Sequence, residues 1–319
     1  MRRAQWYAHF VLIFVGLVSA YMFARVLYPV CLDDCYARHR EVIEGTAPSP
    51  YRYRILSPIL VEAMARTIPQ DPAIGNAVAY TLAHALVLPI MFVLVYRWLK
   101  TQAEDQSALF GTLLLAPYLF VGYQNYGTSL YTMVEIALFC GVLWWMKRSE
   151  PPFIIFVALV ILATLNRETG FLLVAAYAAL KFPESASRRK PYLVRLVVAG
   201  LAWLVTYGLL RVILGDAVHP WTPDQLMEGN LGYWLVHALL HNGLLLPVFV
   251  GGLLGLKSAT REQKLLLLAM LPYVVLMILF SIWHEVRLWF VLFPVIMPII
   301  LRWQEKIRET PSASSGVLQ

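Results

Sequence analysis

The chain is dominated by apolar runs that approach the length of a membrane span, and this pattern restricts its fold more than any other feature. Of the 319 residues, 60% are hydrophobic and only 14% are charged. Successive apolar runs of this length are typical of helices that cross a bilayer, because a hydrocarbon core about 30 Å thick needs roughly 20 apolar residues in helical form. The sequence therefore predicts an all-α, polytopic helical membrane protein.

Charged breaks divide the apolar sequence into about ten expected transmembrane helices. These lie near residues 8–30, 73–96, 108–123, 128–146, 153–165, 170–182, 191–214, 242–256, 265–283 and 288–302. An even number of spans places both termini on one side of the membrane. Most of the Lys and Arg residues in the breaks then fall on that same side, which the positive-inside rule identifies as the cytoplasm.

We predict one multi-span domain over residues 1–308 and a disordered tail over residues 309–319. The polar stretches on the opposite side include a first outer loop at 31–72 and a large outer loop at 215–241. Segment 54–68 is too short and too charged to span, and its apolar spacing predicts a helix in the membrane interface. Cytoplasmic loops account for the net charge of +7, so we exclude nucleic acid as a partner.

The stretch from Pro152 to Lys181 is too short for two ordinary spans. Two helices of roughly 13 residues would each rise about 20 Å, against a hydrocarbon core of about 30 Å. We therefore expect the turn between them, residues 166–170 (NRETG), to lie within the outer half of the membrane. A single long span is the alternative, and it would move the basic residues 188–190 to the outer face.

An adjacent pair of acids, Asp33 and Asp34, follows the first expected span directly. A carboxylate at the interface can act as a general base that takes a proton from a substrate hydroxyl. The simpler interpretation is that Asp34 caps a helix over residues 35–45. Cys31 and Cys35 can pair if both face an oxidising compartment, whereas a metal site here lacks a recognised ligand spacing. We predict no cofactor; a divalent metal is neither required nor excluded.

Arginines stand out in two of the outer segments. Arg52 and Arg54 alternate with tyrosines, a pattern that fits either interfacial anchors or a fork for a lipid phosphate. Arg167 and Glu168 lie in the NRETG turn, where each charge inside the bilayer costs about 2.5–3.5 kcal/mol, so compensation is required. A structural ion pair with another span is one interpretation, and a polar substrate cavity is the other. We interpret Glu135 as a structural partner for an arginine.

The outer turn before the last expected span contains His284, Glu285 and Arg287. This turn repeats the combination of an acid and an arginine that occurs in the NRETG turn. An ordinary polar turn is the simpler interpretation, because loops are usually polar. We retain the three residues as candidates for substrate binding.

This arrangement resembles the GT-C superfamily of membrane glycosyltransferases, which use polyprenyl-phosphate-linked sugars. The resemblance covers most of the chain and rests on an acid pair after the first span, a long first outer loop and many later spans. Its local motifs are DD at 33–34, YRYR at 51–54, NRETG at 166–170 and HEVR at 284–287. The resemblance implies that the base is Asp33 or Asp34 and that the carrier phosphate is held by arginines, with candidates Arg52, Arg54, Arg167 and Arg287. Glu168, His284 and Glu285 complete the expected substrate site.

The expected function is sugar transfer from a polyprenyl-phosphate donor to a glycan, lipid or protein acceptor. We expect the site on the outer face of a bacterial inner membrane, with both termini in the cytoplasm. The first alternative is a transporter or lipid flippase in which the short hairpin lines a translocation path. A second alternative, an acyltransferase, would need His9 or His84 as its base, and neither has an acidic neighbour in sequence.

Overall fold

The computed structural model describes residues 2–124, 130–150, 152–181, 189–216, 223–231, 245–280 and 289–309, and within these ranges it is all-α. The longer helices are α1 (Arg2–Ile43), α3 (Pro72–Leu99), α4 (Asp105–Gln124), α5 (Leu130–Arg148), α8 (Arg189–Leu214), α12 (Arg261–Phe280) and α14 (Phe293–Glu309). The shorter ones are α2 (Leu56–Ala65), α6 (Phe153–Asn166), α7 (Phe171–Lys181), α9 (Pro223–Leu231) and α11 (Leu246–Gly255). Three 3-10 turns are η1 (Tyr51–Tyr53), η2 (Glu168–Gly170) and η3 (Phe290–Leu292).

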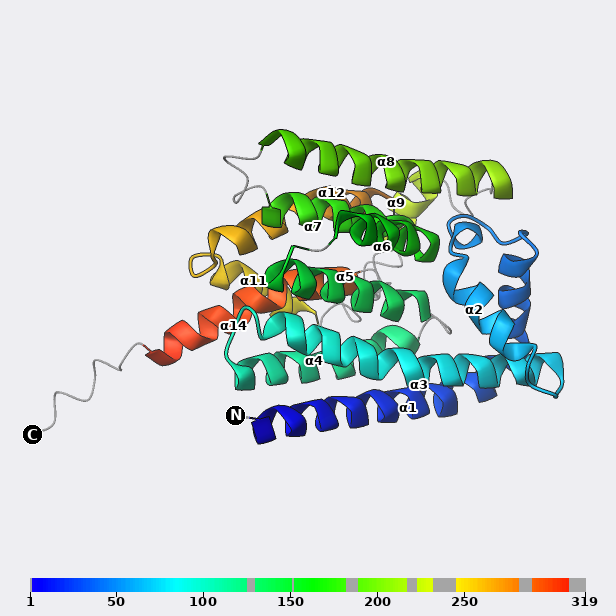
Figure 1. Ribbon diagram of the computed structural model, residues 1–319. Helices are drawn as coiled ribbons and strands as arrows, with labels where there is room; N and C mark the ends of the chain where they lie inside the picture. The colour runs from blue at the N-terminus through cyan, green and yellow to red at the C-terminus, as the bar shows by residue number, and fades with distance from the viewer. Residues whose placement is uncertain are drawn as a thin grey trace, which may run out of the picture.

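The long helices lie side by side in one bundle, and α1 begins at the same end of it at which α14 ends (Figure 1). Five segments are long and apolar enough to cross a membrane, by length and composition. They are Gln5–Arg25, Pro72–Leu99, Leu130–Arg148, Lys190–Leu214 and Arg261–Leu279. A helix occurs at each of the ten expected positions, but the expected count of ten spans is not confirmed, because several of those helices are too short.

Helices α1 and α3 run antiparallel in close contact. The ring of His9 contacts Tyr96, and Phe23 contacts His84, so residue numbers rise on one helix as they fall on the other. Gly16 lies close to the backbone of α3: a Cβ built there would be 2.6 Å from the Cα of Pro89. Small residues allow membrane helices to approach backbone to backbone in this way.

Helix α1 bends after its apolar segment. Phe23 and His39 would be about 24 Å apart on a straight helix, since each residue rises about 1.5 Å. Both nevertheless contact α3 within one turn, because Phe23 packs on His84 and His39 on Tyr80. The bend therefore lies between Phe23 and His39. The last part of α1 therefore joins α2 at one end of the bundle (Figure 1).

Helix α2 lies within the segment 54–68 in which the sequence predicted a short helix. Its buried residues Ser57, Pro58 and Val61 form the inner face, and the helix packs against α3. Asp71 then begins α3, because its carboxylate accepts a hydrogen bond from the backbone N–H of Ala73 at 2.9 Å.

The short hairpin predicted between residues 152 and 181 is present. Helix α6 has 14 residues and α7 has 11, and η2 separates them. The rings of Phe156 on α6 and Tyr177 on α7 stack at 4.8 Å, which shows that the chain reverses direction between them. The alternative of a single long span through this stretch is therefore wrong, since Arg167 has an extended backbone that interrupts the helix.

Replacing Gly16 by alanine should lower the free energy of unfolding by about 1–3 kcal/mol, because the added methyl group meets backbone atoms of Pro89 that cannot move aside. Gly200→Ala on α8 is the matched control, since a Cβ there has nothing within 4 Å. We expect Gly200→Ala to be neutral or slightly stabilising. Thermal unfolding in detergent micelles measures both effects, and equal shifts would contradict the close contact of α1 and α3.

Candidate functional site

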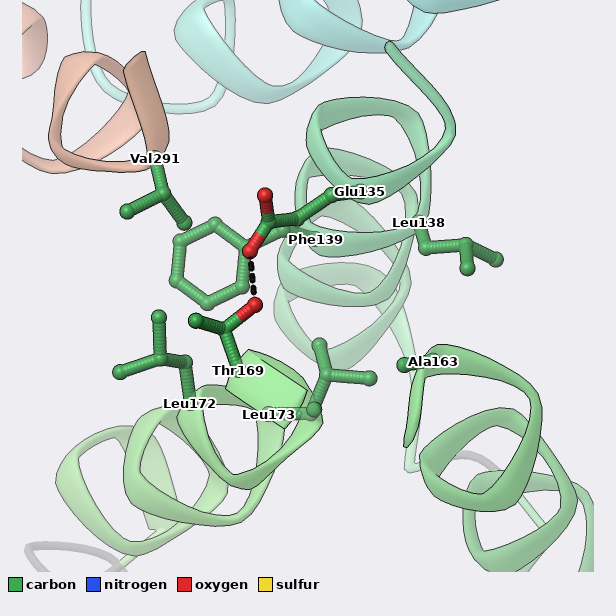
Figure 2. A pocket seen from close by; sticks show the side chains of 9 residues that line it. Glu135, Leu138, Phe139, Ala163, Thr169, Leu172, Leu173 and Val291 are labelled. Carbon is green, nitrogen blue, oxygen red and sulfur yellow. Dashed lines mark hydrogen bonds between the residues drawn. The ribbon is translucent and has the colours of Figure 1, made fainter. Parts of the chain in front are cut away.

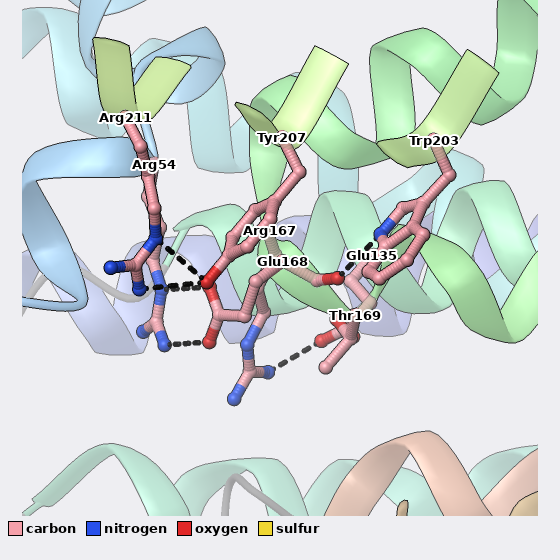
Figure 3. Close-up of polar contacts among 8 residues, drawn as sticks. All are labelled: Arg54, Glu135, Arg167, Glu168, Thr169, Trp203, Tyr207 and Arg211. Atoms are coloured by element: carbon pink, nitrogen blue, oxygen red, sulfur yellow. Dashed lines mark hydrogen bonds and ion pairs between the residues drawn. The ribbon is translucent and has the colours of Figure 1, made fainter. Parts of the chain in front are cut away.

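Two arginine–glutamate pairs lie side by side around the NRETG turn (Figure 3). Arg54, just before α2, donates from both Nε and Nη2 to the Glu168 carboxylate, and the Nε–Oε2 distance is 3.0 Å. Arg167 donates from Nη1 to Oε2 of Glu135 on α5 at 2.5 Å. Three segments far apart in sequence thus supply two positive and two negative charges, which balance formally.

The two pairs differ in their burial. The side chains of Arg167 and Glu135 are 1% and 10% exposed, so this pair is enclosed at both ends. Arg54 is also buried, at 5%, but its partner Glu168 is 29% exposed. A buried charge without a partner is strongly destabilising. In each pair, the arginine and the glutamate therefore offset the free-energy cost of burying one another's charge.

Tyr131 of α5 lies between the two arginines. Its ring centroid is 5.0 Å from the guanidinium carbon of Arg54 and 5.9 Å from that of Arg167. Tyr51 provides a second ring for Arg54, at 5.2 Å. These cation–π contacts hold the guanidinium of Arg54 in a defined orientation.

Hydrogen bonds from neighbouring segments hold the turn itself. Asn166 accepts a hydrogen bond from Ser57 of α2 and donates one to the backbone oxygen of Tyr131, both at 2.7 Å. Trp203 of α8 donates from Nε1 to the backbone oxygen of Glu168 at 3.2 Å. The turn is also tight at Gly170, where a Cβ would lie 2.7 Å from the backbone nitrogen of Thr164.

A small pocket opens beside the enclosed pair (Figure 2). Glu135 and Thr169 provide its polar side, and the Thr169 hydroxyl donates a hydrogen bond to the Glu135 carboxylate. The other lining residues are Leu138, Phe139, Ala163, Gly170, Leu172, Leu173 and Val291. Its empty volume of about 260 Å³ includes space that is open to the outside. The enclosed part has room for about one water molecule, so the pocket does not enclose a sugar phosphate.

Arg52 has a different role from Arg54. Its guanidinium donates to the backbone oxygen of Ala47 at 2.9 Å and to those of Leu214 and Asp216 at 3.2 Å. The hydroxyl of Tyr53 donates to the backbone oxygen of Gly215 at 3.1 Å. These contacts fasten η1 to the end of α8, so Arg52 positions the segment that carries Arg54.

Asp33 and Asp34 lie within the continuous helix α1, so the interpretation of Asp34 as a helix cap is wrong. Both side chains are exposed, on the side of α1 away from buried Cys35 and His39. Neither acid forms a hydrogen bond or ion pair with another side chain in the described part of the chain, and neither joins the two pairs at the turn. Cys35 is disulfide-bonded, so it is not available as a thiolate ligand for a metal.

The other sequence candidates are accounted for as follows. His284, Glu285 and Arg287 lie outside the described residues. His9 and His84, the candidates for an acyltransferase base, each place Nδ1 at 2.7 Å from a backbone oxygen four residues earlier in their own helix. No group of three metal-ligating side chains gathers within the described residues.

Two clusters were not singled out by the sequence reasoning. The first links the bent part of α1 to α2 and α3: His39 Nε2 is 3.1 Å from Glu62 Oε2, and its Nδ1 is 3.1 Å from the Tyr80 hydroxyl. The second is a column on α8, in which Trp203 and Tyr207 stack and Tyr207 accepts hydrogen bonds from Arg211 (Figure 3). The spacing of four residues in the second cluster was a sequence signal, since such residues share a helix face.

Comparisons with protein-family models, with curated proteins and with solved structures found no match to this chain. The chemistry of the site residues therefore carries the functional assignment.

Acid pH should destabilise the protein through His39. Burial lowers the pKa of His39, although the hydrogen bond that its ring donates to the Glu62 carboxylate raises it. As pH falls below the unfolded value of about 6.5, the unfolded chain takes up the proton first, so stability present above that pH is lost. We expect the melting temperature in detergent to fall from pH 7 towards pH 5, and His39→Gln should flatten this dependence. Identical pH profiles for both proteins would contradict the role of His39.

Proposed function

We propose that the protein is a membrane glycosyltransferase that transfers a sugar from a polyprenyl-phosphate carrier to an acceptor hydroxyl. The observation that carries the proposal is the buried guanidinium of Arg54, which binds both oxygens of a carboxylate and lies between two tyrosine rings. A planar fork of this kind binds phosphate oxygens in the same bidentate way. The five segments capable of crossing a membrane provide the setting for a lipid-linked substrate.

Among the four arginines considered, we assign the carrier phosphate to Arg54. Arg52 is occupied by backbone oxygens, and Arg167 is enclosed with Glu135. Arg54 alone of these three described arginines is paired with an acid whose side chain is partly exposed. Arg287 keeps its place as a candidate from the sequence.

In the proposed reaction, the hydroxyl oxygen of the acceptor forms a bond to the anomeric carbon of the donor sugar. Asp33 or Asp34 takes the hydroxyl proton, and both carboxylates are exposed to an acceptor that arrives from water. The bond from the anomeric carbon to the phosphate oxygen breaks, and its electron pair stays on the lipid phosphate. Arg54 stabilises the negative charge that develops on this leaving group.

The disulfide at Cys35 supports a location of the first outer loop in an oxidising compartment. Disulfides persist in the bacterial periplasm and are rare in the cytosol. We therefore propose that α2 and the bent part of α1 lie on the outer face of a bacterial inner membrane, with both termini in the cytoplasm.

A transporter or lipid flippase is the second candidate, and one observation favours it. Helices α6 and α7, of 14 and 11 residues, are shorter than a full span and meet at a charged turn. Interrupted helices with polar turns near the middle of the membrane are a feature of secondary transporters.

Purified protein in proteoliposomes, incubated with radiolabelled polyprenyl-phosphate sugars and membrane extract, should transfer label to an acceptor. We expect Arg54→Gln to abolish transfer, and either Asp33→Asn or Asp34→Asn to slow it by about 10²–10⁴-fold, the usual contribution of a general base. Asp105→Asn is the control, because Asp105 is an exposed acid at the first residue of α4 and pairs with Lys100, which follows α3. Movement of lipid or solute without sugar transfer from any donor would contradict the transferase and favour the transporter.

A further inference from the structure

The Arg54–Glu168 pair is built from one fixed partner and one that can leave. Arg54 is buried between Tyr51 and Tyr131, and Arg52 fastens its segment to the end of α8. The side chain of Glu168, at 29%, is the most exposed of the four charged side chains at the turn. Because the contacts with Tyr51, Tyr131 and the end of α8 hold Arg54 and its segment, its guanidinium would keep its place if the Glu168 carboxylate moved away.

The backbone at Glu168 is held independently of its side chain. Trp203 binds the backbone oxygen, and the neighbouring residues Asn166 and Thr169 are hydrogen-bonded to α2 and α5. Rotation of the Glu168 side chain away from Arg54 thus leaves the turn in place. The Arg167–Glu135 pair has no such freedom, because both its side chains are enclosed and Thr169 also binds the Glu135 carboxylate.

We propose that Glu168 is an internal counter-ion that occupies the phosphate position on Arg54 while the carrier is absent, and that the carrier phosphate displaces it. This inference rests on the proposed function. The donor's phosphate is a diester, which offers two free oxygens and one negative charge, as a carboxylate does. The polyprenyl phosphate released by transfer is a monoester with the same oxygens and more negative charge, so both forms of the carrier can take the carboxylate's place on the fork. Glu168 keeps Arg54 from being a buried, unpaired charge between rounds of binding.

The exchange makes Glu168 a competitor of the ligand, and its removal should strengthen binding. Glu168→Gln should lower the melting temperature of the free protein, because Arg54 loses its counter-ion. Farnesyl phosphate in detergent micelles should then raise the melting temperature of Glu168→Gln more than that of the wild type. If Glu168 occupies Arg54 for roughly nine-tenths of the time, the affinity for farnesyl phosphate should rise about tenfold. Farnesol, which lacks the phosphate, should have no such effect.

Glu135→Gln is the matched control, since it makes the same chemical change in the enclosed pair. We expect it to be destabilised without rescue by farnesyl phosphate. Glu168→Asp provides a second variant if Glu168→Gln does not fold. Its shorter side chain binds Arg54 less well, so the affinity of this variant for farnesyl phosphate should lie between those of the wild type and Glu168→Gln.

The possible failures are distinguishable. If wild type binds farnesyl phosphate, Arg54→Gln does not, and the Glu168 variants bind with unchanged affinity, the counter-ion exchange is overturned and the proposed function stands. If no variant, including the wild type, prefers farnesyl phosphate over farnesol, the phosphate site on Arg54 fails, and the exchange fails with it. If farnesyl phosphate raised the melting temperatures of Glu135→Gln and Glu168→Gln equally, the exchange would also be overturned, because the ligand would show no preference for the Arg54–Glu168 pair.

Discussion

The pairing of buried charges at the NRETG turn is the interaction on which the rest of this structure depends. Arg167 and Glu168 lie between two short helices inside an apolar bundle, where unpaired charges would cost much of a protein's net stability. Their partners come from α5 and from the segment before α2, so the pairs join three separate parts of the chain. The short helices α6 and α7 are tolerated because the turn between them is bound on several sides.

The architecture at this end of the bundle follows from the same requirement. Arg54 can reach Glu168 only because the chain between α1 and α3 folds against the bundle, and three devices hold it there. Helix α1 bends, His39 joins α1 to Glu62 and Tyr80, and Arg52 fastens η1 to the end of α8. The segment between the apolar part of α1 and α3 is thus a layer of short helices packed on the bundle, with the guanidinium of Arg54 on its inner side.

The sequence correctly predicted the all-α class, the short hairpin, the helix near 54–68 and Glu135 as the partner of an arginine. These predictions depend on the lengths of apolar runs and on charges within them, and both are visible in the sequence. It could not assign Glu168 to Arg54, since 114 positions separate them and only tertiary packing brings them together. It also ended the first helix too early: the acids at 33 and 34 suggested a cap, but α1 continues past them, since polar residues are tolerated on an exposed helix face. The expected count of ten spans is not confirmed: five segments of the described chain are long and apolar enough to cross a membrane, and apolar runs alone do not distinguish a span from a shorter packed helix.

A double-mutant cycle on the enclosed pair tests most directly whether charge pairing is what stabilises the turn. The free energy of unfolding in detergent micelles would be measured for Arg167→Met, Glu135→Leu and the double variant. Each single variant leaves one buried charge unpaired and should lose about 3–5 kcal/mol, whereas the double variant, which removes both charges, should recover most of that loss. Additive losses in the double variant would contradict the account, because they would show that the two charges act independently.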